Sequence, residues 1–380
     1  MLTAHPGGSR LRRDRHRTLD DRLRRRRASL QGDRRLPQRN PRSRGSRKGL
    51  EALSDLVNVG QAGLGAWGQN LVRNVDDLAN LTWICDASTD RGAQFARRFP
   101  QAQLTDSFEA MISDPALEAV VIATPVPTHY ALAKQALEAG KHVFVEKPPA
   151  MRESEMAELV EIAEAKGLVL MPGHLLLYHP GVLKLKQLID SGELGDVLCI
   201  YGNRQNLGKI RKDENALWSL GVHDLSVILY LIGEEPIEAV AHGNSFLTPG
   251  VEDVVFCYLR FPSGKIAHLH LSWLDPHKMR KITVVGRDKM AVFDDMELER
   301  KITVYEKAPE EPSSTYGEWR TRTGDIFSPK IANDEPLKLE VSHFLRLVRE
   351  GGSGVEARDG LVVVQALESL QQSLDAAKGA

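Results

Sequence analysis

Residues 57–68 read Val-Asn-Val-Gly-Gln-Ala-Gly-Leu-Gly-Ala-Trp-Gly, a short strand-forming run that leads into closely spaced glycines. Gly63, Gly65 and Gly68 have the spacing G-x-G-x-x-G, and an amphipathic stretch, residues 69–78, follows directly. In such a turn the first glycine reverses the chain, the second lets a pyrophosphate approach the backbone, and the third lets the helix pack on the strand. The stretch therefore predicts a strand, a tight turn and a helix.

A second apolar run, residues 81–85, ends at Asp86, 18 residues after Gly68. An acid about 20 residues beyond the last glycine is placed to hydrogen-bond an adenine ribose, while the helix N-terminus faces the phosphates. The Asp86 carboxylate would accept from both ribose hydroxyls of NAD and would repel the 2′-phosphate of NADP. We therefore predict an NAD-binding domain. Arg91 is interpreted as a solvated residue on a helix surface.

Predicted helices and short buried strands continue to alternate as far as residue 171, which is typical of a doubly wound, mainly parallel sheet. Ligands of such sheets lie at the carboxyl ends of the strands. Gly63, Asp86, Thr124 and Lys147 all fall at such ends. Lys147 closes a buried strand and precedes two prolines, which stiffen the chain.

The first 50 residues differ from the rest in charge, with 17 Lys and Arg against four Asp and Glu. They lack an apolar stretch long enough for a signal peptide or a membrane span, and we expect disorder. A nucleic-acid-binding arm and an organellar presequence are functional interpretations of this extension. The interpretation we favour is a solvated tail, or residues translated from a start codon upstream of the natural protein.

The remaining chain is long enough for two domains. Its three cysteines are widely separated, so the spacing indicates neither a zinc site nor a disulfide framework. His268 and His270 could face a metal from one strand, but sheet packing is the interpretation we favour, and we expect no metal. The composition suits a soluble protein of a reducing compartment, the cytoplasm.

Several motifs together resemble the Gfo/Idh/MocA oxidoreductases. They are Ala123-Thr124-Pro125, Glu146-Lys147-Pro148 and Gly221-Val222-His223-Asp224, in that order along the chain. The resemblance implies an α/β protein with an N-terminal Rossmann sheet, doubly wound and parallel, and a C-terminal α/β domain with an open, mostly antiparallel sheet. It also implies that this open sheet supplies the interface of a homodimer or homotetramer.

The resemblance implies domain boundaries as well. We expect an Arg-rich disordered extension over 1–54, the NAD-binding domain over 55–174, the substrate and oligomerisation domain over 175–356, and a final helix over 357–380 that packs back on the first domain. In the second domain, residues 216–232 predict one long helix that Gly233 ends. Strands are predicted over 237–242, 252–261, 265–273 and 281–286, and residues 307–334 are predicted as a loop or extended segment.

The resemblance also assigns roles to residues. Lys147 would hydrogen-bond the reacting hydroxyl, and His223 would be the general acid/base, so these are the predicted catalytic residues. The Lys147-Pro148 bond is a candidate for the cis form. Ser219 stands where the family often has an aspartate, which leaves open whether water or Asp224 completes the proton relay. The predicted cofactor-binding residues are Gly63, Gly65, Ala66, Trp67, Gly68, Asp86, Thr124, Pro125, His129, Glu146 and Lys147.

Further residues are candidates for binding the substrate. His174 and Tyr178 lie in the segment that opens the second domain, where a packing role is the alternative. Residues 203–212 form a basic, amide-rich segment between a strand predicted over 197–201 and the predicted helix. Its charges would bind an anionic substrate, and the alternative is an exposed charged loop that pairs with Asp213 and Glu214. The predicted substrate-binding residues are His174, Tyr178, Arg204, Lys209, Arg211, Ser219 and Asp224.

The motifs around residues 173–180, 203–208 and 218–224 look most like those of dehydrogenases that oxidise the C3 hydroxyl of UDP-N-acetylglucosaminuronate for surface polysaccharides. A free polyol or inositol substrate is the alternative within the family. An alternative of another class is a non-catalytic sensor of NAD(P), which Ser219 and the Arg-rich extension favour, but Lys147 and His223 do not. We expect a small-molecule partner and neither a membrane nor a nucleic acid.

Overall fold

The computed structural model describes residues 56–208, 210–212, 214–310, 319–352 and 354–378. These residues belong to one compact unit. The predicted extension over 1–54 and the predicted substrate contact Lys209 lie outside the described residues. No helix within the described ranges is both long and apolar enough to cross a membrane.

The first sheet has six parallel strands in the order β3-β2-β1-β4-β5-β6. This order places the β1 and β4 carboxyl ends side by side, at the point where the winding of a Rossmann sheet reverses. The doubly wound parallel sheet is thus confirmed. Its strands are β1 (Asn58–Ala62), β2 (Asn80–Cys85), β3 (Gln103–Thr105), β4 (Ala119–Ile122), β5 (His142–Glu146) and β6 (Leu170–Gly173).

Local signals in the sequence set the ends of the helices around this sheet. Ser88 and Ser107 accept hydrogen bonds from the first turns of two helices, and Gly167 ends another in the left-handed conformation. The helices are α2 (Gly68–Leu78), α3 (Thr89–Arg98), α4 (Phe108–Ile112), α5 (His129–Glu138) and α6 (Glu153–Lys166), with a short turn η1 (Val126–Thr128) before α5.

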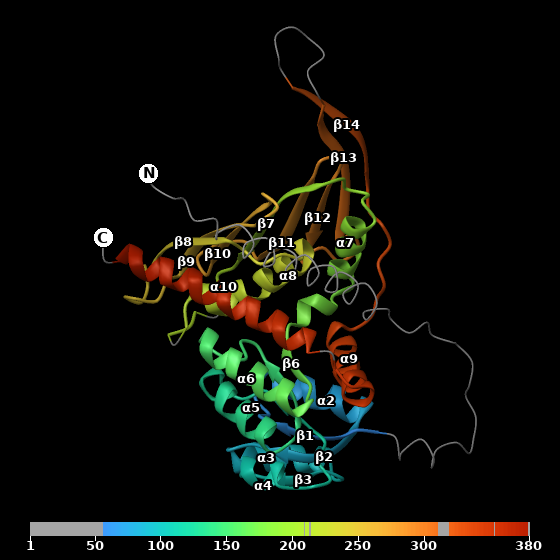
Figure 1. The fold of residues 1–380 in the computed structure, drawn as a ribbon, viewed down its shortest axis with the longest axis vertical. Helices are drawn as coiled ribbons and strands as arrows, with labels where there is room; N and C mark the ends of the chain where they lie inside the picture. The colour runs from blue at the N-terminus through green and yellow to red at the C-terminus, as the bar shows by residue number, and fades with distance from the viewer. Residues whose placement is uncertain (1–55, 209, 213, 311–318, 353, 379–380) are drawn as a thin grey trace, which may run out of the picture. The chain divides into compact units, whose positions relative to one another are not determined.

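The second sheet has eight strands in the order β14-β13-β12-β11-β7-β10-β9-β8 (Figure 1). Every neighbouring pair is antiparallel except β7 with β10, so the mostly antiparallel sheet is confirmed. Its strands are β7 (Val197–Gln205), β8 (Glu238–Asn244), β9 (Val254–Arg260), β10 (Ile266–Ser272), β11 (Met279–Gly286), β12 (Met290–Asp294), β13 (Ile302–Glu310) and β14 (Arg320–Phe327).

The strands at one edge of this sheet escaped the sequence analysis. Strands β12 and β13 were not anticipated, and β14 lies in the segment predicted as a loop or extended segment. All eight residues of β14 are exposed, so it has no alternation of buried and exposed side chains. Such a strand lacks the period-two signal by which a half-buried strand is recognised.

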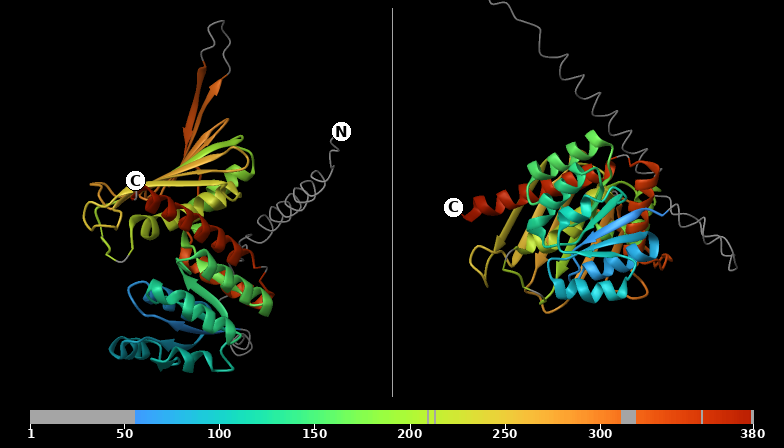
Figure 2. Two further views of the ribbon diagram at one scale, coloured as in Figure 1. Left: turned by 60° about the vertical axis from the view of Figure 1, so that its left-hand side comes forward. Right: turned by 90° about the horizontal axis from the view of Figure 1, so that it is seen from below.

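The helices of the second half cover this sheet and return to the first. Helix α8 packs on β7, whereas α10, red in Figure 2, contacts β8 and also α6 and β6. The helices are α7 (Pro180–Asp190), α8 (Val222–Ile232), α9 (Pro336–Glu350) and α10 (Val355–Lys378), with the short turns η2 (Leu175–Tyr178) and η3 (Leu217–Gly221).

Residues 216–232 do not form the single regular helix that was predicted. Leu217–Gly221 is a π-helical turn, and the α-helix begins only at Val222. A π turn has one extra residue and is frequent at functional sites. It therefore changes the direction of the side chains just before His223.

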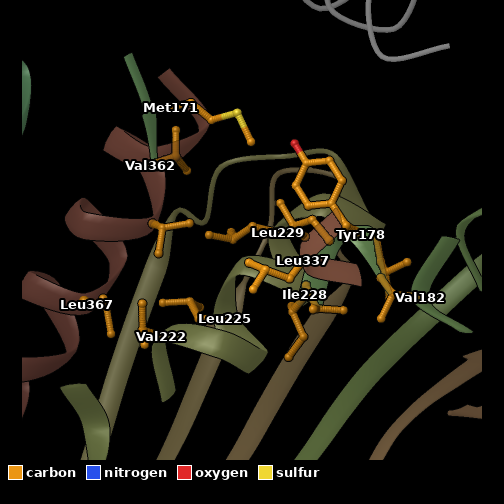
Figure 3. Packing of buried hydrophobic residues seen from close by; sticks show 14 of the residues in the cluster. Met171, Tyr178, Val182, Val222, Leu225, Ile228, Leu229, Leu337, Val362 and Leu367 are labelled. Atoms are coloured by element: carbon orange, nitrogen blue, oxygen red, sulfur yellow. The ribbon is translucent and has the colours of Figure 1, made fainter. Parts of the chain in front are cut away.

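The hydrophobic core continues from the first sheet through η2 to α8, α9 and α10. Figure 3 shows Tyr178 within it, beside Leu337, Leu229 and Val182. The Tyr178 hydroxyl is 2.6 Å from Nδ1 of His343 on α9, and both side chains are buried. This hydrogen bond joins η2 to α9 inside the core.

Candidate active site

The glycine turn joins β1 to α2, and its three glycines occupy three different environments. Gly63 has a φ of 89°, and a Cβ there would lie 2.5 Å from the carbonyl oxygen of Ala123. A Cβ on Gly68 would lie 2.1 Å from the carbonyl oxygen of Gly63, whereas one on Gly65 would have no protein atom within 4 Å. The turn therefore leaves open space at the position where a pyrophosphate approaches the backbone, so these residues fit a dinucleotide.

Asp86 lies at the end of β2 and is buried. Its Oδ2 accepts a hydrogen bond from the Leu64 amide at 2.8 Å, and its Oδ1 accepts one from the Ser88 amide at 2.8 Å. Arg91 donates to both oxygens, at 3.1 and 3.2 Å. Arg91 is therefore an ion-pair partner of Asp86 and not only a solvated helix residue. Asp86 holds the glycine turn in place, and a ribose would have to share its carboxylate with Arg91.

Two strand-end loops of the first sheet are joined through His129. Its Nδ1 is 2.8 Å from the carbonyl oxygen of Pro148, and its Nε2 is 2.7 Å from that of Thr124. His129 is buried, and burial lowers its pKa. The buried His129 ring thus lies between the Thr124-Pro125 loop and the Lys147-Pro148 loop and bridges them. Both ring nitrogens of His129 lie against backbone carbonyl oxygens, and its contact with the cofactor stays a prediction.

Lys147 follows β5, and the bond to Pro148 is cis. Burial lowers the pKa of Lys147, and the nearby cations Arg211 and Arg204 lower it further, against the opposing effect of the Glu146 and Glu214 carboxylates. Glu146 accepts a hydrogen bond from the exposed Trp67 through Oε1 at 2.5 Å, and one from the Lys147 amide through Oε2 at 3.2 Å. Glu146 therefore links the glycine turn to the lysine.

His223 lies in the first turn of α8 and is partly accessible. Burial lowers its pKa well below the ordinary value, and the positive charges of Lys147, Arg204, His174 and Arg280 lower it further. A lysine from the first sheet and an imidazole from α8 therefore act on each other in one site. The imidazole is neutral at pH 7 and can accept a proton.

The strand predicted over 197–201 extends further, as β7, and includes Arg204, which is buried. Its Nε and Nη2 donate to the two carboxylate oxygens of Asp224 at 2.5 and 3.1 Å. Asp224 is 1% exposed in its side chain, so the pair is a buried, bidentate link between β7 and α8. Arg204 and Asp224 therefore bind each other, and their roles as substrate contacts stay predictions.

Two further arginines bring positive charge to the site. Arg211 forms an ion pair with Glu214, as the alternative interpretation of this segment held. Arg280 was missed by the sequence analysis. It lies directly opposite Arg204 in the β7–β11 register, and opposed residues of an antiparallel pair share one face of the sheet. The half-exposed Arg280 donates to Asp295 at 3.3 Å, and only the sheet register could have revealed it.

The remaining predicted substrate contacts divide into two groups. Ser219 in the π turn and His174 after β6 are both buried, and the His174 charge acts on His223. The Ser219 hydroxyl has no hydrogen-bond partner among the described residues. Tyr178, in contrast, is placed in the core with His343, and its role as a substrate contact stays a prediction.

The two histidines considered for a metal pack in the sheet. His268 stacks on Tyr201 with ring centroids 4.9 Å apart, and His270 stacks on Phe256 at 4.3 Å. Within the described residues, no group of three His, Cys, Asp or Glu side chains could hold a metal ion. The polar residues gathered at the site are instead a lysine, an imidazole and arginines, at the edge of a dinucleotide turn.

Comparison with known families agrees with this arrangement. A model described as an oxidoreductase family with an NAD-binding Rossmann fold matches residues 57–174, and the GFO/IDH/MocA C-terminal domain matches residues 182–292. Together they cover more than half of the 380 residues. The chain belongs to the GFO/IDH/MocA oxidoreductase family. The predictions of this family, of an enzyme and of NAD as the cofactor are thereby confirmed.

Curated relatives of this family member have several activities. The chain is 29% identical to 2,7-anhydro-N-acetylneuraminate hydratase of Escherichia coli over 56% of its own length and 61% of the hydratase, less than two thirds of that protein. It is 27% identical to UDP-N-acetylglucosamine 3-dehydrogenase of Acidithiobacillus ferrooxidans, covering 63% of this chain and 74% of the relative. It is 26% identical to scyllo-inositol 2-dehydrogenase of Bacillus subtilis, covering 78% and 87%.

The same fold occurs in the solved structure of the Acidithiobacillus ferrooxidans enzyme. The two structures superpose with a TM-score of 0.70 at 24% identity, covering 84% of this chain and 98% of the other. At this identity the likeness shows the fold alone. The two proteins therefore share the fold that contains both sheets, and the comparison does not extend to the residues that contact a substrate.

Proposed function

We propose that the protein oxidises a secondary hydroxyl of a sugar, with Lys147 and His223 as the catalytic residues. The observation that carries this proposal is the placement of Lys147, at the carboxyl end of β5, close enough to His223, in the first turn of α8, for the lysine charge to lower the pKa of the imidazole. Bound NAD supplies the acceptor for the hydride that leaves the carbon. His223 takes the hydroxyl proton as the ketone forms, and Lys147 hydrogen-bonds the reacting oxygen.

The arrangement around His223 supports Ser219 as a further contact of the substrate or of an ordered water. Its hydroxyl is buried within the π turn, without a partner in the described part of the chain. A buried polar atom of this kind requires a hydrogen bond from a ligand or water. Because Asp224 is engaged by Arg204, the proton that His223 takes would pass through such a water and not through Asp224.

The substrate we propose is an anionic sugar nucleotide, specifically a UDP-N-acetyl-hexuronate oxidised at C3 in the synthesis of a surface polysaccharide. Arg280 and Arg211 place guanidinium groups near the site, and arginine recognises carboxylate and phosphate through paired hydrogen bonds. The relative that oxidises a UDP-sugar supports a nucleotide substrate. The inositol dehydrogenase supports a neutral polyol as the competing substrate.

The test is NADH production from a panel of substrates: UDP-N-acetylglucosaminuronate, UDP-N-acetylglucosamine and scyllo-inositol. Lys147→Ala and His223→Ala should each lower kcat by about 10²- to 10⁴-fold while NADH still binds. The matched control is Lys134→Ala, since Lys134 is a surface lysine that pairs with Glu158. Turnover of no compound in the panel, with NADH binding intact, would contradict this proposal and favour a non-catalytic sensor.

Arg280→Gln distinguishes a sugar nucleotide that carries a uronate carboxylate from one that lacks it. The variant should lose about 10- to 100-fold in kcat/KM for the uronate, the range expected for one charged hydrogen-bonded contact. It should lose much less for UDP-N-acetylglucosamine, which lacks the carboxylate. An equal loss on both substrates would show that Arg280 does not read the uronate group.

A further inference from the structure

Glu340 on α9 is a buried acid that the proposed reaction does not use. Its exposed fraction is 0%, and neither carboxyl oxygen has a hydrogen-bond partner among the described residues. An ionised carboxylate in such surroundings would lose its hydration without compensation. Burial raises the pKa of Glu340 well above its ordinary value, and the Glu146 carboxylate raises it further. Glu340 is therefore a neutral acid inside the protein.

The packing of α9 on the first sheet places Glu340 over Glu146. Phe344 lies one turn after Glu340 on the same helix face, and its ring meets Phe144 edge to face at 5.8 Å. Phe144 and Glu146 are two residues apart on β5 and therefore share one face of the sheet. A Cβ built on the neighbouring Gly173 would touch both, at 3.1 Å from Phe144 and 3.2 Å from Glu146. The two acids thus face each other across the contact between helix and sheet.

Glu146 is the member of the pair that contacts the site. Its two oxygens accept from the Trp67 indole, which belongs to the glycine turn, and from the Lys147 backbone. Burial raises the pKa of Glu146 to about 7, with Trp67 and Lys147 opposing the rise. Two neighbouring buried carboxyl groups do not both ionise near neutral pH, because the charge of one raises the pKa of the other. A second negative charge would repel Glu146 and disturb both of its contacts.

We propose that Glu340 is a positioning residue that stays protonated and so limits the buried acid pair to one negative charge, carried by Glu146. That single charge holds Trp67 at the cofactor turn and the Lys147 backbone in register. The role of the pair at Lys147 rests on the proposed function, whereas its effect on the cofactor turn does not. Ionisation of Glu340 at high pH should loosen the turn and weaken NADH binding.

The first test is spectroscopic and needs no substrate. The full chain labelled with ¹³C-glutamate should show the infrared carbonyl band of a protonated carboxylic acid at pH 8. The band should be lost in Glu340→Gln and kept in Glu335→Gln, the matched control. Glu335 lies at the start of the same helix but is exposed and paired with Arg73. Absence of the band from the labelled wild type overturns the proposal, whether or not the variant folds.

The second test is the affinity for NADH from pH 7 to pH 10. The wild type and Glu335→Gln should bind NADH about ten-fold more weakly at the alkaline end, because a second negative charge would repel Glu146 and disturb its contact with Trp67 in the cofactor turn; a factor of ten corresponds to about 1.4 kcal/mol. Glu340→Gln cannot ionise and should lack this loss. Superimposable profiles for all three proteins overturn the proposal, and failure to find a sugar substrate leaves both tests intact.

Discussion

His223 carries a specific expectation about pH. Its pKa lies well below the ordinary value because of burial and of the surrounding positive charges. A base with a lowered pKa stays deprotonated as the pH falls, until the pH approaches that lowered value. The imidazole is thus available for proton abstraction over the whole neutral range and into mild acid.

We therefore predict that, in a Glu146→Gln background that removes the carboxyl group whose pKa is about 7, kcat/KM for sugar oxidation stays constant from pH 8 down to below 6.5. The acid limb should appear only under the ordinary histidine pKa, since protonation of His223 removes the base. The measurement is the pH profile of NADH production, with His277→Asn as the control because His277 is an exposed histidine on a loop. An acid limb centred at 6.5 or above would contradict the environment described for His223.

In the glycine turn between β1 and α2, one glycine leaves space for the cofactor and another is needed for packing of the fold. Gly68 packs against the carbonyl oxygen of Gly63, whereas the position of a Cβ on Gly65 is free of protein atoms. The same substitution at the two glycines should therefore have different effects.

We predict that Gly65→Ala leaves thermal stability nearly unchanged but weakens NADH binding, because the added methyl group enters the space of the pyrophosphate. Gly68→Ala should destabilise the fold by about 1–3 kcal/mol or more, since its methyl group would overlap a backbone carbonyl. Thermal melts with and without NADH measure both effects. Equal loss of thermal stability in the two variants would contradict the separate roles of Gly65 in cofactor binding and Gly68 in packing.

At the scale of the whole molecule, the raised pKa of Glu146 predicts how the free energy of unfolding depends on pH. The pKa of Glu146 is about 7 in the folded protein, against 4.5 for a glutamate in the unfolded chain. The folded state therefore binds more protons than the unfolded state between these values. The contribution of Glu146 to the stability of the folded protein is complete below pH 4.5 and is lost as the pH rises through about 7.

We predict that Glu146→Gln lacks this decline. The difference in unfolding free energy between wild type and variant should change by about 3 kcal/mol between pH 4.5 and pH 8, at about 1.4 kcal/mol for each unit of pKa shift. Urea unfolding at several pH values measures it, and Glu335→Gln is the control. A constant difference across this range would contradict the raised pKa.

The sequence by itself determined the features whose signals are local. The glycine spacing and the acid after the second strand predicted the cofactor turn, and helix caps and apolar runs predicted the parallel sheet. Lys147 and His223 were found because each belongs to a short motif. The division into domains at residues 55, 175 and 357, the oligomer and the roles of the site residues stay predictions.

Only the tertiary structure decided which polar groups meet. Arg204 and Asp224 pair because β7 packs on α8, and Arg280 enters the site through the register of β7 with β11. Tyr178 points into the core because α9 returns to cover η2, and the same helix brings Glu340 over Glu146. These contacts join segments that are far apart in the chain. The relative positions of such segments produce no periodic or local pattern in the sequence.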